Sequence, residues 1–544
     1  MIGNGRPSEF VTSNRAVVRP RRLSIDSLVT PNVIWAIVLT ASASILSIPL
    51  AVAWYVSLAK TIALWAVIVL MNVLAAWTLR KKFGSSTPKR YLLPFFVAVL
   101  ISFYLFAARA PHRPQQCVAK VAYSAWDAFC TQPDSASYYF GYFPASSRQP
   151  LYPWFIKLVT SGFNAQQWAR RHPAGVAISD PTDPLLRVER AQILFLLGSA
   201  SLTCLWMMYL LNSPLPGILF VSLYYGVFMV PHELNQIMTE TLVQAWLFLL
   251  VSAFLAFVWK PRKQLLPVAG ALCGALYLTR QASGYAVIFM VAMIIWGMIR
   301  NRRAYWLASA LSLMAFACLA VIPDAYGYVK LGNVSSAQNN LQYQYRIAYA
   351  LQFAQPQDAR LMPDEYSRHW LVEKINMRQS AHNKVREMCQ GDPYCQQVYY
   401  INTNLYNLAT PPGFDPPNRA QFYMNIATPI LKRHPVDYFL FAFRSWTLAI
   451  TNGVSKIRIP GITPWFVYAL CLVGIVWSRG QVGFSAGFLI LGHLFHVALS
   501  CLFAAPIGRM IRASEFLVVI AVFLLLWEAF ERISAGLMTM PKAD

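Results

Sequence analysis

Long runs of apolar residues constrain the fold of this chain more than any other feature. A helix needs about 20 apolar residues to cross the hydrocarbon core of a bilayer. About twelve stretches approach or reach that length, at residues 32–56, 61–79, 91–108, 192–211, 215–230, 240–259, 265–278, 284–299, 305–322, 464–477, 483–504 and 514–530. Only 12% of the residues are charged, against about 25% in a soluble domain. The sequence therefore predicts an all-α polytopic membrane protein of about 12 transmembrane helices.

Basic residues in the short connections predict the orientation of these helices. The connections after the second, sixth and eighth runs carry Arg80, Lys81, Lys82, Lys89, Arg90, Lys260, Arg262, Lys263, Arg300, Arg302 and Arg303. Cytoplasmic loops are enriched in such residues. If every run crosses once, all three connections share a side with the arginine-rich residues 1–31, which we interpret as a cytosolic tail. The net charge of +24 then suits an anionic lipid surface, and no basic helix with interleaved aromatics suggests a nucleic-acid partner.

This orientation divides the chain into membrane segments and two large outer loops. The expected order is the tail (1–31), three helices (32–108), a first outer loop (109–190), core helices (191–322), a second outer loop that forms a subdomain (323–460) and C-terminal helices (461–544). Residues 436–450 are apolar but interrupted by Arg444, and their length suits an interfacial helix better than a crossing. If they do cross, the helices number thirteen and the C-terminus lies outside.

The nine cysteines fall into two groups. Five lie within apolar runs, where cysteine is an ordinary small apolar residue. Each outer loop holds two of the others, which suggests the disulfides Cys117–Cys130 and Cys389–Cys395 in an oxidising compartment. Free thiols and metal ligands are the alternatives. No Cys-x-x-Cys pair is present and no clear ligand set identifies a metal, so a cofactor, including a divalent cation, stays open.

Several polar residues collect near the expected outer ends of the helices. The first outer loop holds Asp134, Tyr138, Tyr139, Arg148 and Tyr152 within about twenty residues, although the tyrosines alone would also fit an aromatic belt at the membrane surface. The connection after residue 230 leads to two further acids, Glu233 and Glu240. Glu240 opens an apolar run, where a carboxylate also complements the helix dipole.

Arg280 follows the apolar run at 265–278. An arginine between two apolar helices is costly unless it is paired or binds an anion, so we expect it either to pair with Glu240 or to hold a phosphate through its guanidinium fork. Arg509 and Arg512 share this side in a twelve-helix protein, whereas in a thirteen-helix protein they are cytoplasmic charges. His493 and His496 are three residues apart, and we expect them to make hydrogen bonds in helix packing.

The order of these motifs resembles the GT-C membrane glycosyltransferases. The matching segments are Pro133-Asp134-Ser-Ala-Ser-Tyr-Tyr, Arg148-Gln-Pro-Leu-Tyr-Pro153, Met238-Thr-Glu-Thr-Leu242 and Leu278-Thr-Arg-Gln281. The nearest likeness, to the bacterial aminoarabinose and protein O-mannosyl transferases, covers about residues 91–328. The chain departs from the family in having two apolar runs, at 32–56 and 61–79, before the run at 91–108 that leads into the first outer loop. It also has serine after Asp134, where many relatives have a second acid or glycine, and Asp127 is a rival for the role of Asp134.

The resemblance implies a GT-C-like bundle in a bacterial inner membrane, with the active site facing the periplasm. Such enzymes move a sugar from a polyprenyl-phosphate donor to a glycan, lipid or protein acceptor, so the expected partners are membrane lipids, the donor and the acceptor. Asp134 would be the catalytic base, with Glu233 or Glu240 as a second acid, and the transfer would invert the sugar. Arg280, with Arg509 or Arg512, would stabilise the phosphate. Tyr138, Tyr139, Arg148 and Tyr152 would bind the sugar or the acceptor.

Two other functions fit the same sequence. A transporter or flippase of lipid-linked glycans predicts charges at the bilayer midplane and discontinuous helices, whereas the charges here fall near outer helix ends. A polymerase or ligase of lipid-linked glycans shares the large outer loop and the arginines.

Overall fold

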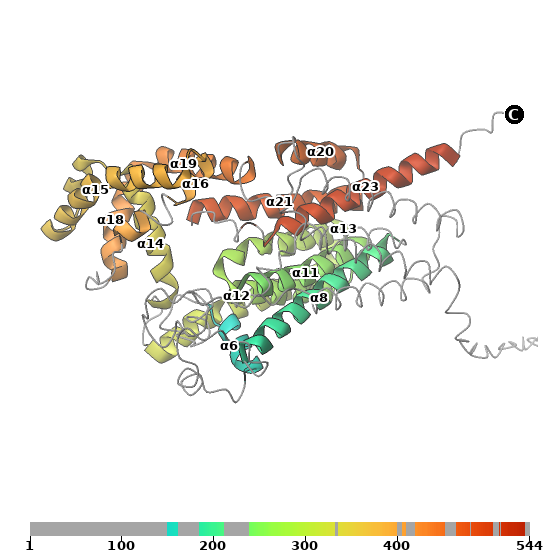
Figure 1. Ribbon diagram of the computed structural model, residues 1–544. Helices are drawn as coiled ribbons and strands as arrows, with labels where there is room; N and C mark the ends of the chain where they lie inside the picture. Colours follow the sequence, from blue (N-terminus) through green and yellow to red (C-terminus); the bar gives the residue numbers. More distant parts are fainter. Residues whose placement is uncertain are drawn as a thin grey trace, which may run out of the picture.

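A computed structural model describes residues 149–160, 184–211, 239–331, 336–399, 405–409, 419–451, 464–478, 480–503, 511 and 513–538. Within these ranges the chain is helical and has no strand (Figure 1). Four helices are long and apolar enough to cross a membrane: Arg190–Leu210, Thr239–Trp259, Gln281–Ala325 and Gln481–Leu502. These are the features of a helical membrane protein. The runs predicted at 32–56, 61–79, 91–108 and 215–230 lie outside the described residues.

The first described helices pack side by side through small polar residues as well as apolar ones. Helix α6 (Leu151–Val159) contacts α8 (Pro184–Leu210), and α8 lies along α11 (Thr239–Trp259). Between α8 and α11, Thr203 Oγ1 is 2.8 Å from Ser252 Oγ and donates to the Phe248 carbonyl oxygen at 3.0 Å. Hydroxyls that bond inside a bundle in this way join membrane helices, because lipid offers them no partner.

Helix α12 (Leu265–Thr279) packs closely against α13 (Val287–Leu331) at two glycines. A Cβ atom added to Gly270 would lie 2.1 Å from the Ser312 carbonyl oxygen, and one added to Gly274 would lie 2.6 Å from Leu319 Cβ. Ser312 Oγ donates to the Leu266 carbonyl oxygen at 2.7 Å across the same contact. The Gly-x-x-x-Gly spacing of these two residues is a known signal for close helix approach in membranes.

A break divides α13 into two helices. Asn301 has φ −161° and ψ 90°, and its Oδ1 accepts the backbone N–H of Ala304 at 3.0 Å, as an N-cap does. The break falls between the two apolar runs expected at 284–299 and 305–322, within the basic connection that sequence analysis placed in the cytoplasm.

A helical subdomain follows α13. It comprises α14 (Ser336–Phe353), η5 (Pro356–Leu361), α15 (Glu365–Cys389), α16 (Pro393–Tyr399), α17 (Tyr406–Ala409) and α18 (Arg419–Arg433). Its own buried core includes Tyr349, Trp370 and Tyr423. Arg378 Nη1 donates to three carbonyl oxygens at the end of α14, those of residues 351, 352 and 354, at 2.8–3.0 Å. A cation at a helix C-terminus complements the dipole and satisfies its free carbonyls.

The last described helices are α19 (Pro435–Thr451), α20 (Pro464–Trp477), α21 (Gln481–Phe503) and α23 (Glu515–Met538). Helix α19 runs antiparallel to α21, because Tyr438 donates to the Leu502 carbonyl oxygen and Trp446 to that of Leu494. The rings of Tyr468 and His493 stack at 6.2 Å, and a Cβ on Gly487 would meet Ile475, so α20 is also antiparallel to α21.

Helices α19 and α20 run in the same direction, both antiparallel to α21. Helix α19 contains residues 436–450, the stretch expected to lie in the membrane interface. Helix α19 lies alongside the second half of α21, a candidate membrane span (Figure 1). Its side-chain bonds to α21 carbonyls explain this orientation, which hydropathy alone did not reveal.

Candidate functional site

One end of the bundle gathers the polar side chains of several helices. Helix α11 begins there, α12 and α21 end there, and α23 begins there. We call it the Arg280 end. In Figure 1 it is the end of the bundle nearest the subdomain of α14 to α18.

Arg280 is held at the end of α12. Its backbone N–H donates to the Leu276 carbonyl oxygen at 2.9 Å, and its extended backbone (φ −157°, ψ 121°) separates α12 from η4 (Gln281–Ala286). Arg280 Nη1 lies 3.0 Å from Glu240 Oε1, and the two side chains are 19% and 13% exposed. This is one of the two roles that the sequence suggested for Arg280.

The ion pair leaves most of the guanidinium available. An arginine has five N–H donors in a planar fork, and the bond to Glu240 uses one of them. Among the described residues, no other hydrogen bond of this side chain is found. The Arg280 side chain is partly exposed and Glu240 fixes the position of the fork, so the remaining donors are candidates for binding an anionic ligand.

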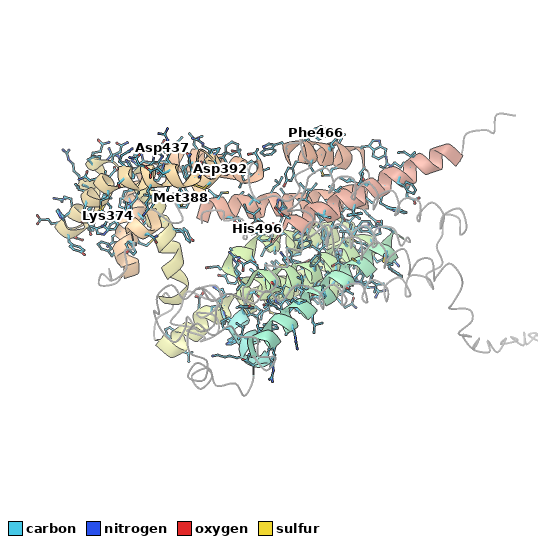
Figure 2. All side chains as sticks on the ribbon, in the orientation of Figure 1. Lys374, Met388, Asp392, Asp437, Phe466 and His496 are labelled. Atoms are coloured by element: carbon cyan, nitrogen blue, oxygen red, sulfur yellow. A yellow bond between two sulfur atoms is a disulfide. The ribbon has the colours of Figure 1, made fainter. Side chains whose placement is uncertain are left out.

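Helix η4 places Tyr285 against α21. The Tyr285 ring stacks on His496 with centroids 4.1 Å apart, and both side chains are buried. The Arg280 charge lies within electrostatic reach of both. Figure 2 labels His496 where α21 faces the layer formed by α11, α12 and α13. The site therefore lies where η4 meets α21.

Both histidines of α21 contact one serine. His493 Nδ1 and His496 Nδ1 lie 2.9 and 2.6 Å from Ser514 Oγ, which also lies 3.3 Å from the Ile511 carbonyl oxygen. A hydroxyl has one proton to donate, so at least one of the imidazoles donates from Nδ1 to the serine. The expected hydrogen bonds of the histidines are therefore present.

Sequence reasoning missed Ser514 and Tyr285 as part of this site. A signal for Ser514 was available, since it is the first residue of the apolar run at 514–530 and is followed by Glu515, a pattern typical of a helix start. Nothing local indicated Tyr285, because only the packing of η4 on α21 brings it to the histidines.

Three other predicted residues lie elsewhere in the structure. Tyr152 is fully buried in α6 and donates from its hydroxyl to Gln192 Oε1 at 2.9 Å, so its ring is not open to a sugar here. Cys389 and Cys395 form a disulfide in the subdomain, the pairing suggested for that loop. The remaining predicted residues lie outside the described ranges: Asp127, Asp134, Tyr138, Tyr139, Arg148, Glu233, Arg509, Arg512, Cys117 and Cys130.

In the described ranges, no group of three or more His, Cys, Asp or Glu side chains is arranged to hold a metal ion. Comparison of the chain with protein-family models, curated proteins and solved structures finds no match. Its function therefore has to be inferred from the chemistry of the site.

Proposed function

We propose that this protein is an integral-membrane glycosyltransferase that takes a sugar from a polyprenyl-phosphate donor at the Arg280 end of the bundle. The observation that carries the proposal is the state of Arg280, which is partly buried, follows an apolar helix and uses one N–H in the pair with Glu240. A lipid phosphate matches these surroundings, because its phosphate suits the guanidinium fork and its tail suits the apolar helices.

The reaction needs charge stabilisation at the phosphate. The acceptor oxygen attacks C1 of the sugar, the bond from C1 to the phosphate oxygen breaks, and the lipid phosphate leaves with the bonding electrons. We assign to Arg280 the stabilisation of the negative charge that develops on this oxygen. The proton of the acceptor hydroxyl goes to a base, the role we assign to Asp134 on sequence grounds. One displacement without a covalent enzyme intermediate inverts the configuration at C1.

We further propose an acceptor and a side of the membrane for this transfer. The acceptor is a glycan, a lipid or a protein on the outer face of a bacterial inner membrane. Positive charge in the connections on the opposite side supports this orientation, because the basic residues between the halves of α13 lie at the far end of α12 from Arg280.

A transporter of lipid-linked glycans is the second candidate. The observation that favours it is the pair of buried histidines on α21, a candidate span, both bonded to Ser514. Ionisable residues inside membrane helices are rare and often belong to proton or substrate pathways.

The deciding experiment is transfer of labelled sugar from polyprenyl-phosphate donors by the full-length protein in proteoliposomes. Wild type is compared with Asp134→Asn, Arg280→Gln and the control Arg386→Gln, which removes an exposed arginine of α15. We expect transfer by wild type and the control, and a fall of roughly 100-fold or more in Arg280→Gln, the usual effect of losing one preorganised donor. No transfer with any donor, together with movement of labelled lipid-linked glycan across the bilayer, would replace the enzyme with the transporter.

A further inference from the structure

Helix α19 presents an apolar face that no described part of the chain covers. Val436, Phe439, Leu440 and Phe443 are each at least half exposed, and their spacing of three and four residues puts them on one side of the helix. The opposite side, with Ala442, Ser445 and Ala449, is buried. Arg444 lies at the edge of the exposed face, one turn after Leu440, and is itself exposed.

The position of α19 along α21 gives the depth of this face. Tyr438 contacts Leu502 and Trp446 contacts Leu494, so Arg444 lies beside His496. The candidate span in α21 ends at Leu502. Six residues of helix correspond to about 9 Å, which places the backbone of Arg444 about that far inside the end of the span. By the same register Phe439, Leu440 and Phe443 lie between this depth and the end of the span, where lipid rather than water is expected, and Val436 lies just beyond it.

An arginine at this depth needs an anionic partner. Among the described residues, no hydrogen bond or ion pair of the Arg444 side chain is found. Helical side chains tilt toward the helix N-terminus, and the N-terminus of α19 points toward the end of the span. The long side chain of Arg444 therefore extends toward the membrane surface, as basic side chains do when they lie near the ends of membrane segments.

We propose that Arg444 binds the phosphate of an anionic phospholipid in the leaflet at the Arg280 end, and that the acyl chains of this leaflet cover the apolar face of α19. Charge complementarity and the alignment of α19 with a candidate span identify the occupant. The apolar surface also continues onto α20, where Phe466, Leu470 and Val473 are exposed and where Trp465 lies 5.8 Å from Trp446 of α19. This site attaches the subdomain to the lipid surface and is separate from Arg280, so it does not depend on the glycosyltransferase proposal.

Native mass spectrometry of the full-length protein tests the headgroup contact. Dioleoyl-phosphatidylglycerol is titrated into wild type, Arg444→Gln, Arg444→Lys and the control Arg386→Gln, and dioleoyl-phosphatidylcholine is titrated in parallel. We expect Arg444→Gln to weaken the tightest phosphatidylglycerol binding about fivefold, with Arg444→Lys intermediate because it keeps the charge without the fork. The control should match wild type, and phosphatidylcholine binding should change little. Unchanged phosphatidylglycerol binding in Arg444→Gln, or an equal loss for both lipids, would overturn the proposal.

A spin label tests the depth without removing Arg444. Single labels at Leu440→Cys in α19 and, as the matched control, at Glu387→Cys in α15 are compared in proteoliposomes. The label at 440 should collide more with oxygen, which concentrates in the bilayer, and the label at 387 more with a water-soluble nickel complex. A label at 440 that is as accessible to nickel as the one at 387 would place the face in water and overturn the proposal.

Discussion

The ion pair between Arg280 and Glu240 can be perturbed so that its structural and functional roles separate. Arg280 Nη1 and Glu240 Oε1 are 3.0 Å apart in surroundings less than one-fifth exposed. With an effective dielectric constant of about 20, two unit charges at this distance attract by about 5–6 kcal/mol, and desolvation offsets part of that energy. We expect Arg280→Gln or Glu240→Gln alone to lower the free energy of unfolding by about 2–4 kcal/mol.

The double variant, Arg280→Gln with Glu240→Gln, contains neither charge. Two amides can hydrogen-bond to each other, so much of the stability should return, with a coupling energy of about 2 kcal/mol between the two positions. Denaturant titration of wild type, both single variants and the double variant in the same detergent measures this coupling. Losses that simply add in the double variant would show that the two side chains do not stabilise each other.

Sugar transfer by the same four proteins then separates the two roles. If Arg280 holds the donor phosphate, the double variant regains stability and still fails to transfer sugar, because an uncharged amide does not stabilise the leaving phosphate. Recovery of both stability and transfer would refute the phosphate role and leave Arg280 as a structural partner of Glu240.

Three further predictions concern packing and folding. Gly270→Ala puts a Cβ 2.1 Å from a carbonyl oxygen of α13 and should lower the free energy of unfolding by about 1–3 kcal/mol. The control Gly198→Ala has nothing within 4 Å of the new atom and should be neutral or slightly stabilising. Thermal unfolding midpoints compare the two variants, and equal effects would contradict the tight contact at Gly270. Tyr349→Phe removes a 2.7 Å bond to the Cys501 carbonyl oxygen and should cost about 1 kcal/mol. Burial raises the pKa of Tyr349 well above its usual value in the folded protein, so as the pH rises the unfolded chain loses the tyrosine proton at a lower pH than the folded protein does. Wild type should therefore lose more stability than Tyr349→Phe above about pH 10, and parallel curves of unfolding midpoint against pH would contradict this. Thiol labelling of the unreduced protein should miss the Cys389–Cys395 pair, and modification of both thiols before reduction would rule the bond out.

Local pattern was sufficient to predict several of the apolar helices in the described ranges. The runs expected at 240–259, 265–278 and 464–477 correspond to α11 (Thr239–Trp259), α12 (Leu265–Thr279) and α20 (Pro464–Trp477). These boundaries follow from hydrophobic length and from the polar residues that interrupt it, both of which are properties of the sequence in one dimension. The same logic located Glu240 and Arg280 at helix ends, because a charge is tolerated there more readily than in the middle of a span.

Tertiary structure decided which of these side chains meet. The sequence left Arg280 with either Glu240 or a phosphate as its partner, and the packing of α11 on α12 brings the two residues into contact across 40 positions. The meeting of two histidines at Ser514, the stacking of Tyr285 on His496 and the direction of α19 along α21 likewise depend on how helices pack. Hydropathy predicts the length of an apolar helix. Which helices pack against it depends on close steric fit, such as that at Gly270, and on hydrogen bonds between residues distant in the sequence.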